Sequence, residues 1–198
     1  MRTLAAAAVL AAATLGIAAS AFANPPTTQT LTPPPPSFYN CKAVGAGTIC
    51  EGTRVDSHVL EPSRKFCGSG ADRFELLDTA TNVIHALRYY DTDGNLTKRV
   101  VHEDYTTAET VNSVTGASLP YTQHDILTDV LVVPGDLSSA TSIRTGESNI
   151  TVPGIGALVI NSGRVVTAPD GTIEFEAGRI DFDDFAGAID RICQALGA

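Results

Sequence analysis

Apolar and polar residues alternate along much of the chain, the period-two pattern that predicts β-strands with one buried face. The clearest example is residues 172–178 (TIEFEAG), where isoleucine, phenylalanine and alanine alternate with threonine and glutamate. Similar segments, separated by turn dipeptides, predict strands near residues 81–90, 96–107, 118–133, 139–152 and 155–168. These strands follow one another without helical crossovers. We therefore expect a mainly β protein, an antiparallel β-meander that forms a barrel or a sandwich.

The pattern changes near the C-terminus, where apolar residues recur at helical spacing. They are Phe182, Phe185, Ile189, Ile192 and Leu196. The acidic run at residues 181–184 favours a helix start, because aspartates cap the free amides of a first turn and interact well with the helix dipole. We predict one C-terminal α-helix over about residues 182–197, which covers an end or a face of the sheet.

Residues 88–100 (RYYDTDGNLTKRV) contain the most motif-like segment of the chain. A calcium-binding EF-hand loop that starts at Asp91 needs glycine at position 6 and glutamate at position 12, but these positions hold Leu96 and His102. An Asp-Gly dipeptide between two apolar segments is instead typical of a two-residue hairpin loop. That loop places His85 opposite His102.

A second Asp-Gly dipeptide, at residues 170–171, predicts another two-residue hairpin loop. In this hairpin Val166 faces Phe175 and Ala168 faces Ile173. The apolar face then continues across both strands.

A comparable turn at residues 115–116 produces a candidate site. With a two-residue loop there, Asp129 lies beside His102, so that His85, His102 and Asp129 form a row on one face. Such a row can act as a general acid–base group or hold a metal. The alternative is a polar, partly solvated row, because a slip of one residue in either register moves every side chain to the other face.

Tyrosines are the remaining candidates for ligand contacts. Tyr89 and Tyr121 can line a ligand cavity, although tyrosines are also ordinary strand residues. The sequence contains no nucleophile motif such as G-x-S-x-G and no metal-binding pair of cysteines or histidines. We expect no cofactor and no metal site.

The N-terminal residues predict export. Residues 1–23 combine Arg2, an alanine-rich apolar run and the small-x-small sequence AFA, as in a cleaved secretory signal peptide. Residues 24–37 contain six prolines and predict an extended linker. The remainder, residues 38–198, is expected to form a single domain. With the signal removed, no transmembrane segment is expected.

The charge and the cysteines agree with an extracellular protein. The formal net charge is −9 and no basic stripe is present, so nucleic acid is not an expected partner. Four cysteines in an exported chain favour two disulfides over a zinc site. Of the three possible connectivities we favour Cys41–Cys50, across a local turn, with Cys67–Cys193, which ties the helix to the body.

Four segments together carry a family resemblance: RYYDTDGNLTKRVVHEDYT, VTGASLPYTQHD, GRVVTAPDGTIEFEAG and the closing ICQAL. They resemble secreted proteins of actinobacteria that have no assigned activity, over most of the chain from about residue 67. The resemblance implies a small exported β-protein and no catalytic residue. A meander with a closing helix also resembles lipocalin-type and dirigent-type barrels in architecture.

The sequence thus favours a secreted, non-catalytic binding or interaction module that holds a small apolar ligand in a barrel or a partner on its surface. The partner is an unidentified small molecule or an envelope protein. One alternative is an extracellular hydrolase or isomerase that uses His85, His102 and Asp129. A further alternative is a structural domain associated with the cell envelope.

Overall fold

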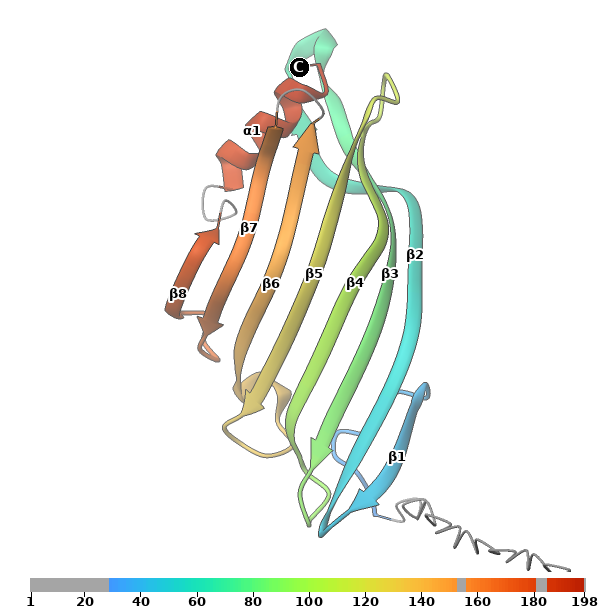
Figure 1. Ribbon diagram of the computed structural model, residues 1–198, viewed down its shortest axis with the longest axis vertical. Coiled ribbons are helices and arrows are strands. Elements are labelled where there is room, and N and C mark those ends of the chain that lie inside the picture. The colour runs from blue at the N-terminus through green and yellow to red at the C-terminus, as the bar shows by residue number, and fades with distance from the viewer. Residues whose placement is uncertain (1–28, 153–155, 181–184, 198) are drawn as a thin grey trace, which may run out of the picture.

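The computed structural model describes residues 29–152, 156–180 and 185–197. The signal peptide predicted for residues 1–23 lies outside them. Within the described ranges, eight strands follow one another and precede a single α-helix (Figure 1). The elements are β1 (Tyr39–Val44), β2 (Gly47–Cys67), β3 (Phe74–Tyr90), β4 (Leu96–Asn112), β5 (Ser118–Leu131), β6 (Ala140–Val152), β7 (Gly156–Thr167), β8 (Ile173–Ile180) and α1 (Phe185–Ala195), with short 3₁₀ turns at Gly70–Asp72 and Leu137–Ser139.

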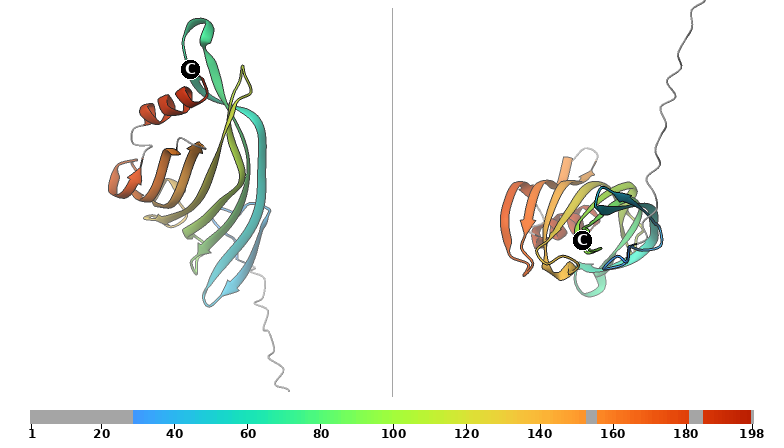
Figure 2. Two further views of the ribbon diagram at one scale, coloured as in Figure 1. Left: turned by 45° about the horizontal axis from the view of Figure 1, so that its top comes forward. Right: turned by 90° about the horizontal axis from the view of Figure 1, so that it is seen from below.

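All eight strands belong to one antiparallel sheet in sequence order, so the predicted meander is confirmed. The sheet curls strongly, but β1 and β8 remain its two edges and it does not close into a barrel (Figure 2). We call the inner side, on which α1 packs, the concave face and the outer side the convex face. Along β3 the even-numbered residues are the more deeply buried and point to the concave face.

Strands β3 to β8 match the predicted segments, whereas β1 and the 21-residue β2 were not predicted. Most of β2 is exposed on both faces and shows no apolar alternation. Its pairing with β3 slips twice, around Pro62, and both Leu60 and Arg64 have positive φ angles. Beyond its pairing with β1, this strand pairs only with β3 among the described strands. An irregular edge strand of this kind lacks the periodicity on which sequence prediction depends.

The hairpin between β3 and β4 has the predicted register but a longer loop. Five residues, 91–95, separate the strands, and the amide of Gly94 donates to the carbonyl oxygen of Asp91 at 3.2 Å. Gly94 has a φ of +85°, and one extra residue of β4 forms a bulge next to the loop. A longer loop with a left-handed glycine and a bulge preserves the pairing. His85 therefore faces His102, as predicted.

The hairpin between β7 and β8 follows the same pattern. The amide of Ala168 donates to Thr172 at 2.8 Å, so the loop again has five residues. Val166 faces Phe175 as predicted, but Ile173 faces Thr167 rather than Ala168, because a bulge separates the two pairs.

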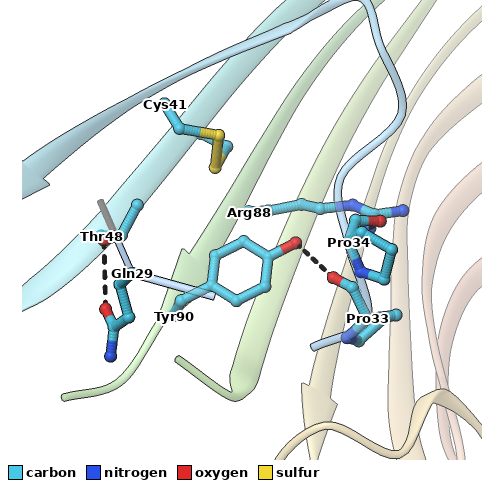
Figure 3. The surroundings of a disulfide bond; sticks show 8 residues. Gln29, Pro33, Pro34, Cys41, Thr48, Arg88 and Tyr90 are labelled. Atoms are coloured by element: carbon cyan, nitrogen blue, oxygen red, sulfur yellow. Dashed lines mark hydrogen bonds between the residues drawn. A yellow bond between two sulfur atoms is a disulfide. The ribbon is translucent and has the colours of Figure 1, made fainter. Parts of the chain in front are cut away.

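At its lower end, the concave face is covered by what we call the N-terminal segment, residues 29–38. The amide of Thr32 donates to the carbonyl oxygen of Gly94, and the amide of Leu96 donates to that of Thr32, both at 2.8 Å. The hydroxyl of Tyr90 donates to the carbonyl oxygen of Pro33 at 2.9 Å (Figure 3). Residues 29–37 of the expected linker are therefore packed against the sheet.

Gly94 is the residue that allows this contact, and its replacement is expected to release the segment. A Cβ atom at Gly94 would lie 2.1 Å from the carbonyl oxygen of Thr30, and the φ of +85° disfavours any side chain. We expect Gly94→Ala to increase hydrogen exchange at the amides of Thr32 and Leu96 and to cost about 1–2 kcal/mol of backbone strain.

Gly45→Ala is the matched control, because Gly45 has a φ of +60° but nothing within 4 Å of an added Cβ. It should carry a similar backbone cost without affecting the Thr32 amide. Equal protection of that amide in both variants would show that Gly94 does not hold the segment.

The upper end of the concave face is covered by α1. Its residues Ala188, Ile192 and Leu196 belong to a core cluster with buried residues of the sheet, among them Phe74 and Val159. The disulfide Cys67–Cys193 joins α1 to the end of β2, and Cys41–Cys50 joins β1 to β2, so both predicted disulfides form. No helix within the described ranges is both long and apolar enough to cross a bilayer.

Candidate functional site

His85 and His102 form the predicted pair, on the convex face. Their ring centroids lie 6.4 Å apart in an edge-to-face arrangement. The Nε2 atom of His85 lies 3.2 Å from a carboxylate oxygen of Glu51, and its Nδ1 atom lies 2.9 Å from the hydroxyl of Thr53. A hollow beside His85 has a volume of about 410 Å³, but His102 does not line it. The two rings therefore do not converge on one cavity.

Asp129 does not join the histidines, which corrects the predicted row. It faces Arg99 across the β4–β5 pair, and its side chain lies buried on the concave face. The Nε atom of Arg99 donates to Asp129, and the hydroxyl of Ser142 donates to its other oxygen at 2.5 Å. Ile126, not Asp129, lies opposite His102. The Asp129 carboxylate therefore forms an ion pair with Arg99 and does not lie beside the histidine rings.

The β4–β5 turn explains this error. Residues 113–117 form a loop longer than two residues, held by Asn112, whose side-chain oxygen accepts from the amides of Val114 and Thr115. A further register shift lies between Asp104 and Glu109. Together they move the pairing by three positions, and an odd shift exchanges the two faces of the sheet.

The two tyrosine candidates lie on opposite faces. Tyr89 is on the convex face, with Nζ of Lys98 over its ring at 5.5 Å. Tyr121 packs against the upper core, and its hydroxyl donates to the carboxylate of Asp78 at 3.1 Å. Burial raises the pKa of the Tyr121 hydroxyl, and the Asp78 carboxylate raises it further. Neither tyrosine borders the pocket described next.

The concave face carries a cavity of about 290 Å³ over β5, β6 and β7, which we call the glycine-floored pocket. It lies on the concave face, because Asp125 pairs with Glu103, and Glu103 pairs with the buried Ile84 of β3. Its lining residues are Gln123, Asp125, Arg144, Gly146, Ser148, Asn161, Gly163 and Val165.

Two glycines from neighbouring strands line this pocket, and a third glycine lies beside them on β8. Gly146 pairs with Gly163, and Gly163 pairs with Gly178. A Cβ atom at Gly146 would lie 2.2 Å from the carbonyl oxygen of His124 and 2.5 Å from Oδ1 of Asp125. A Cβ atom at Gly178 would lie 2.6 Å from the Cα atom of Gly163. Neighbouring atoms thus occupy the positions that these Cβ atoms would take, and at Gly146 and Gly163 the pocket is lined by backbone.

Several polar side chains line the pocket, although most of its exposed lining surface is apolar. The carboxylate of Asp125 is buried, accepts from Nε2 of Gln123 at 2.6 Å and lies 3.5 Å from Nη1 of Arg144. Ser148 and Asn161 add a hydroxyl and an amide. The pocket therefore offers hydrogen-bond donors and acceptors in a charge-balanced setting, which suits a small hydrophilic molecule.

This pocket was not predicted from the sequence. The available signal was glycine inside otherwise regular strands, which marks a bulge or the close approach of another group. That signal does not indicate a ligand, because the polar residues around it come from three strands whose registers were not known. Within the described ranges, no group of three or more His, Cys, Asp or Glu side chains is arranged to hold a metal ion.

Comparison with protein-family models, with curated proteins and with solved structures finds no match for this chain.

Proposed function

We propose that this protein is a secreted, non-catalytic binding module that holds a small hydrophilic molecule in the glycine-floored pocket. The observation that carries the proposal is a pocket lined by backbone and several polar side chains on the inner face of a curled sheet. Ligand sites are concave and use a few well-placed polar groups to orient the ligand. Asp125, Gln123 and Arg144 are already held in place by contacts with one another.

The proposed ligand differs in polarity from the one expected from sequence. An apolar ligand fits a closed barrel with an apolar interior, whereas this sheet is open and the pocket walls carry carboxylate, guanidinium, amide and hydroxyl groups. A hydroxyl-rich or amide-bearing molecule matches these groups. The two disulfides support an oxidising, extracellular setting, in agreement with the signal peptide expected at residues 1–23.

The catalytic alternative has less support. General acid–base catalysis needs the reacting groups within hydrogen-bond reach of one bound substrate. His85 and His102 lie on the convex face, and Asp129 lies buried on the other face with Arg99. Three groups distributed in this way do not share a substrate.

The proposal is tested with protein purified from its own host and analysed by native mass spectrometry. We expect a small hydrophilic molecule to remain bound to the wild-type protein and its occupancy to fall at least about tenfold in Ser148→Phe, because the new ring fills the pocket. Thr145→Phe is the matched control, since Thr145 is on the same strand but faces outwards. Two results would contradict the proposal. One is that Ser148→Phe retains the ligand. The other is that the wild-type protein carries no ligand and binds no hydrophilic compound from a screen.

A further inference from the structure

A second cavity, of about 260 Å³, lies on the concave face nearer its lower end, and we call it the arginine pocket. Residues 36, 38 and 39 of the chain form its rim. Its walls include four apolar side chains from neighbouring strands: Ile84, Ala86, Val101 and Leu127. It shares no lining residue with the glycine-floored pocket.

Three arginines and one glutamate supply the charges of this pocket: Arg54, Arg88, Arg99 and Glu103. A surplus of cations is notable in a chain whose net charge is −9. Arg54 lies 2.8 Å from Asp56, and Arg99 donates to Asp129, so two of the arginines have carboxylate partners. The remaining cation is Arg88.

Arg88 is only 9% exposed, yet no carboxylate in the described part of the chain lies within ion-pair distance of it. Its Nη1 atom donates to the carbonyl oxygen of Pro34 at 3.3 Å (Figure 3), and its guanidinium lies 5.3 Å from the ring centre of Tyr39. Its Nε atom is buried and has no hydrogen-bond acceptor among the residues that the structure describes. A buried cation is costly unless an anion or several acceptors compensate for the lost water.

We propose that the arginine pocket binds a monocarboxylate with an apolar body, whose carboxylate pairs with Arg88 and whose body covers the apolar walls. Guanidinium groups bind carboxylates through charge-assisted hydrogen bonds. Arg88 is one cation, and Glu103 adds a negative charge to the same pocket, so a single negative charge on the ligand is favoured over two. The volume of the cavity, slightly below the range of about 300–1,000 Å³ for drug-sized ligands, requires a small molecule.

The test uses decanoate as the probe and decanol as its uncharged counterpart, with binding measured by isothermal titration calorimetry. We expect the wild-type protein to bind decanoate at least about tenfold more tightly than decanol. Arg88→Gln should remove this preference and leave decanol binding unchanged. Arg73→Gln is the matched control, because Arg73 lies over the ring of Phe66 and outside the pocket.

Val101→Phe provides a second variant that retains Arg88. The larger ring narrows the cavity, so both probes should bind at least about tenfold more weakly. The proposal would be overturned if the wild-type protein bound decanoate and decanol equally well. It would also be overturned if Arg88→Gln or Val101→Phe bound decanoate as tightly as the wild-type protein does. Because the two pockets share no lining residue, Ser148→Phe should leave decanoate binding unchanged, which separates this inference from the proposed function.

Discussion

Removal of the Cys67–Cys193 disulfide is expected to lower the free energy of unfolding by about 4–5 kcal/mol, measured by urea denaturation of the Cys67→Ala/Cys193→Ala variant. The two residues are 126 positions apart, so the bond closes a very long loop and restricts the unfolded chain strongly. The bond also holds α1, which covers the upper core. We expect the loss to be accompanied by faster hydrogen exchange throughout α1.

Cys41→Ala/Cys50→Ala serves as the control, because this disulfide spans only nine positions between paired strands. The chain-entropy model assigns it about 2.5–3 kcal/mol. If removal of Cys67–Cys193 lowers the free energy of unfolding by no more than this, loop length does not determine the stabilisation by the disulfide. Strain or residual structure in the unfolded chain would then determine it.

Arg99→Leu is expected to lower the free energy of unfolding by about 3–5 kcal/mol. It leaves the Asp129 carboxylate buried, with the Ser142 hydroxyl as its remaining side-chain donor among the described residues. The side chain of Asp129 is 2% exposed, so water cannot replace the lost guanidinium. Thermal or urea unfolding at neutral pH measures this loss.

The double variant Arg99→Leu/Asp129→Leu separates the buried charge from the packing. Two leucines remove both charges and keep apolar contacts, so this variant should lie within about 1.5 kcal/mol of the wild-type protein. A double variant as unstable as Arg99→Leu alone would show that packing around the pair, and not the unpaired carboxylate, determines the loss.

The meander, the C-terminal helix and the pairing of His85 with His102 could be predicted because they depend on local chemistry. An Asp-Gly dipeptide places glycine where the backbone needs a positive φ. The loop at Gly94 is longer than the predicted two residues, but the bulge next to it keeps the strand pairing that the shorter loop predicts. The turn after β4 contains no such compensation. There Asn112 closes a longer loop with its side chain, and Asp129 moves to the other face.

The two pockets could not be predicted, because each depends on how far the sheet curls and on what covers its ends. The proline-rich segment illustrates the difficulty. Six prolines between residues 24 and 37 predict an extended chain, but composition does not indicate that Tyr90 and Arg88 donate to the carbonyl oxygens of this segment. Proline removes amide donors and leaves the carbonyl groups available to the sheet.

The open sheet leaves the irregular outer edge of β2 exposed, and the irregularity has a consequence for aggregation. A long, regular edge strand is a template on which another chain can add a strand. On β2, Pro62 lacks an amide donor, and the left-handed residues Leu60 and Arg64 interrupt the spacing of the remaining backbone groups. A foreign strand therefore meets no continuous ladder at this edge. Barrels avoid edge-to-edge association by closure, whereas at this edge of the open sheet the uneven backbone of β2 limits it.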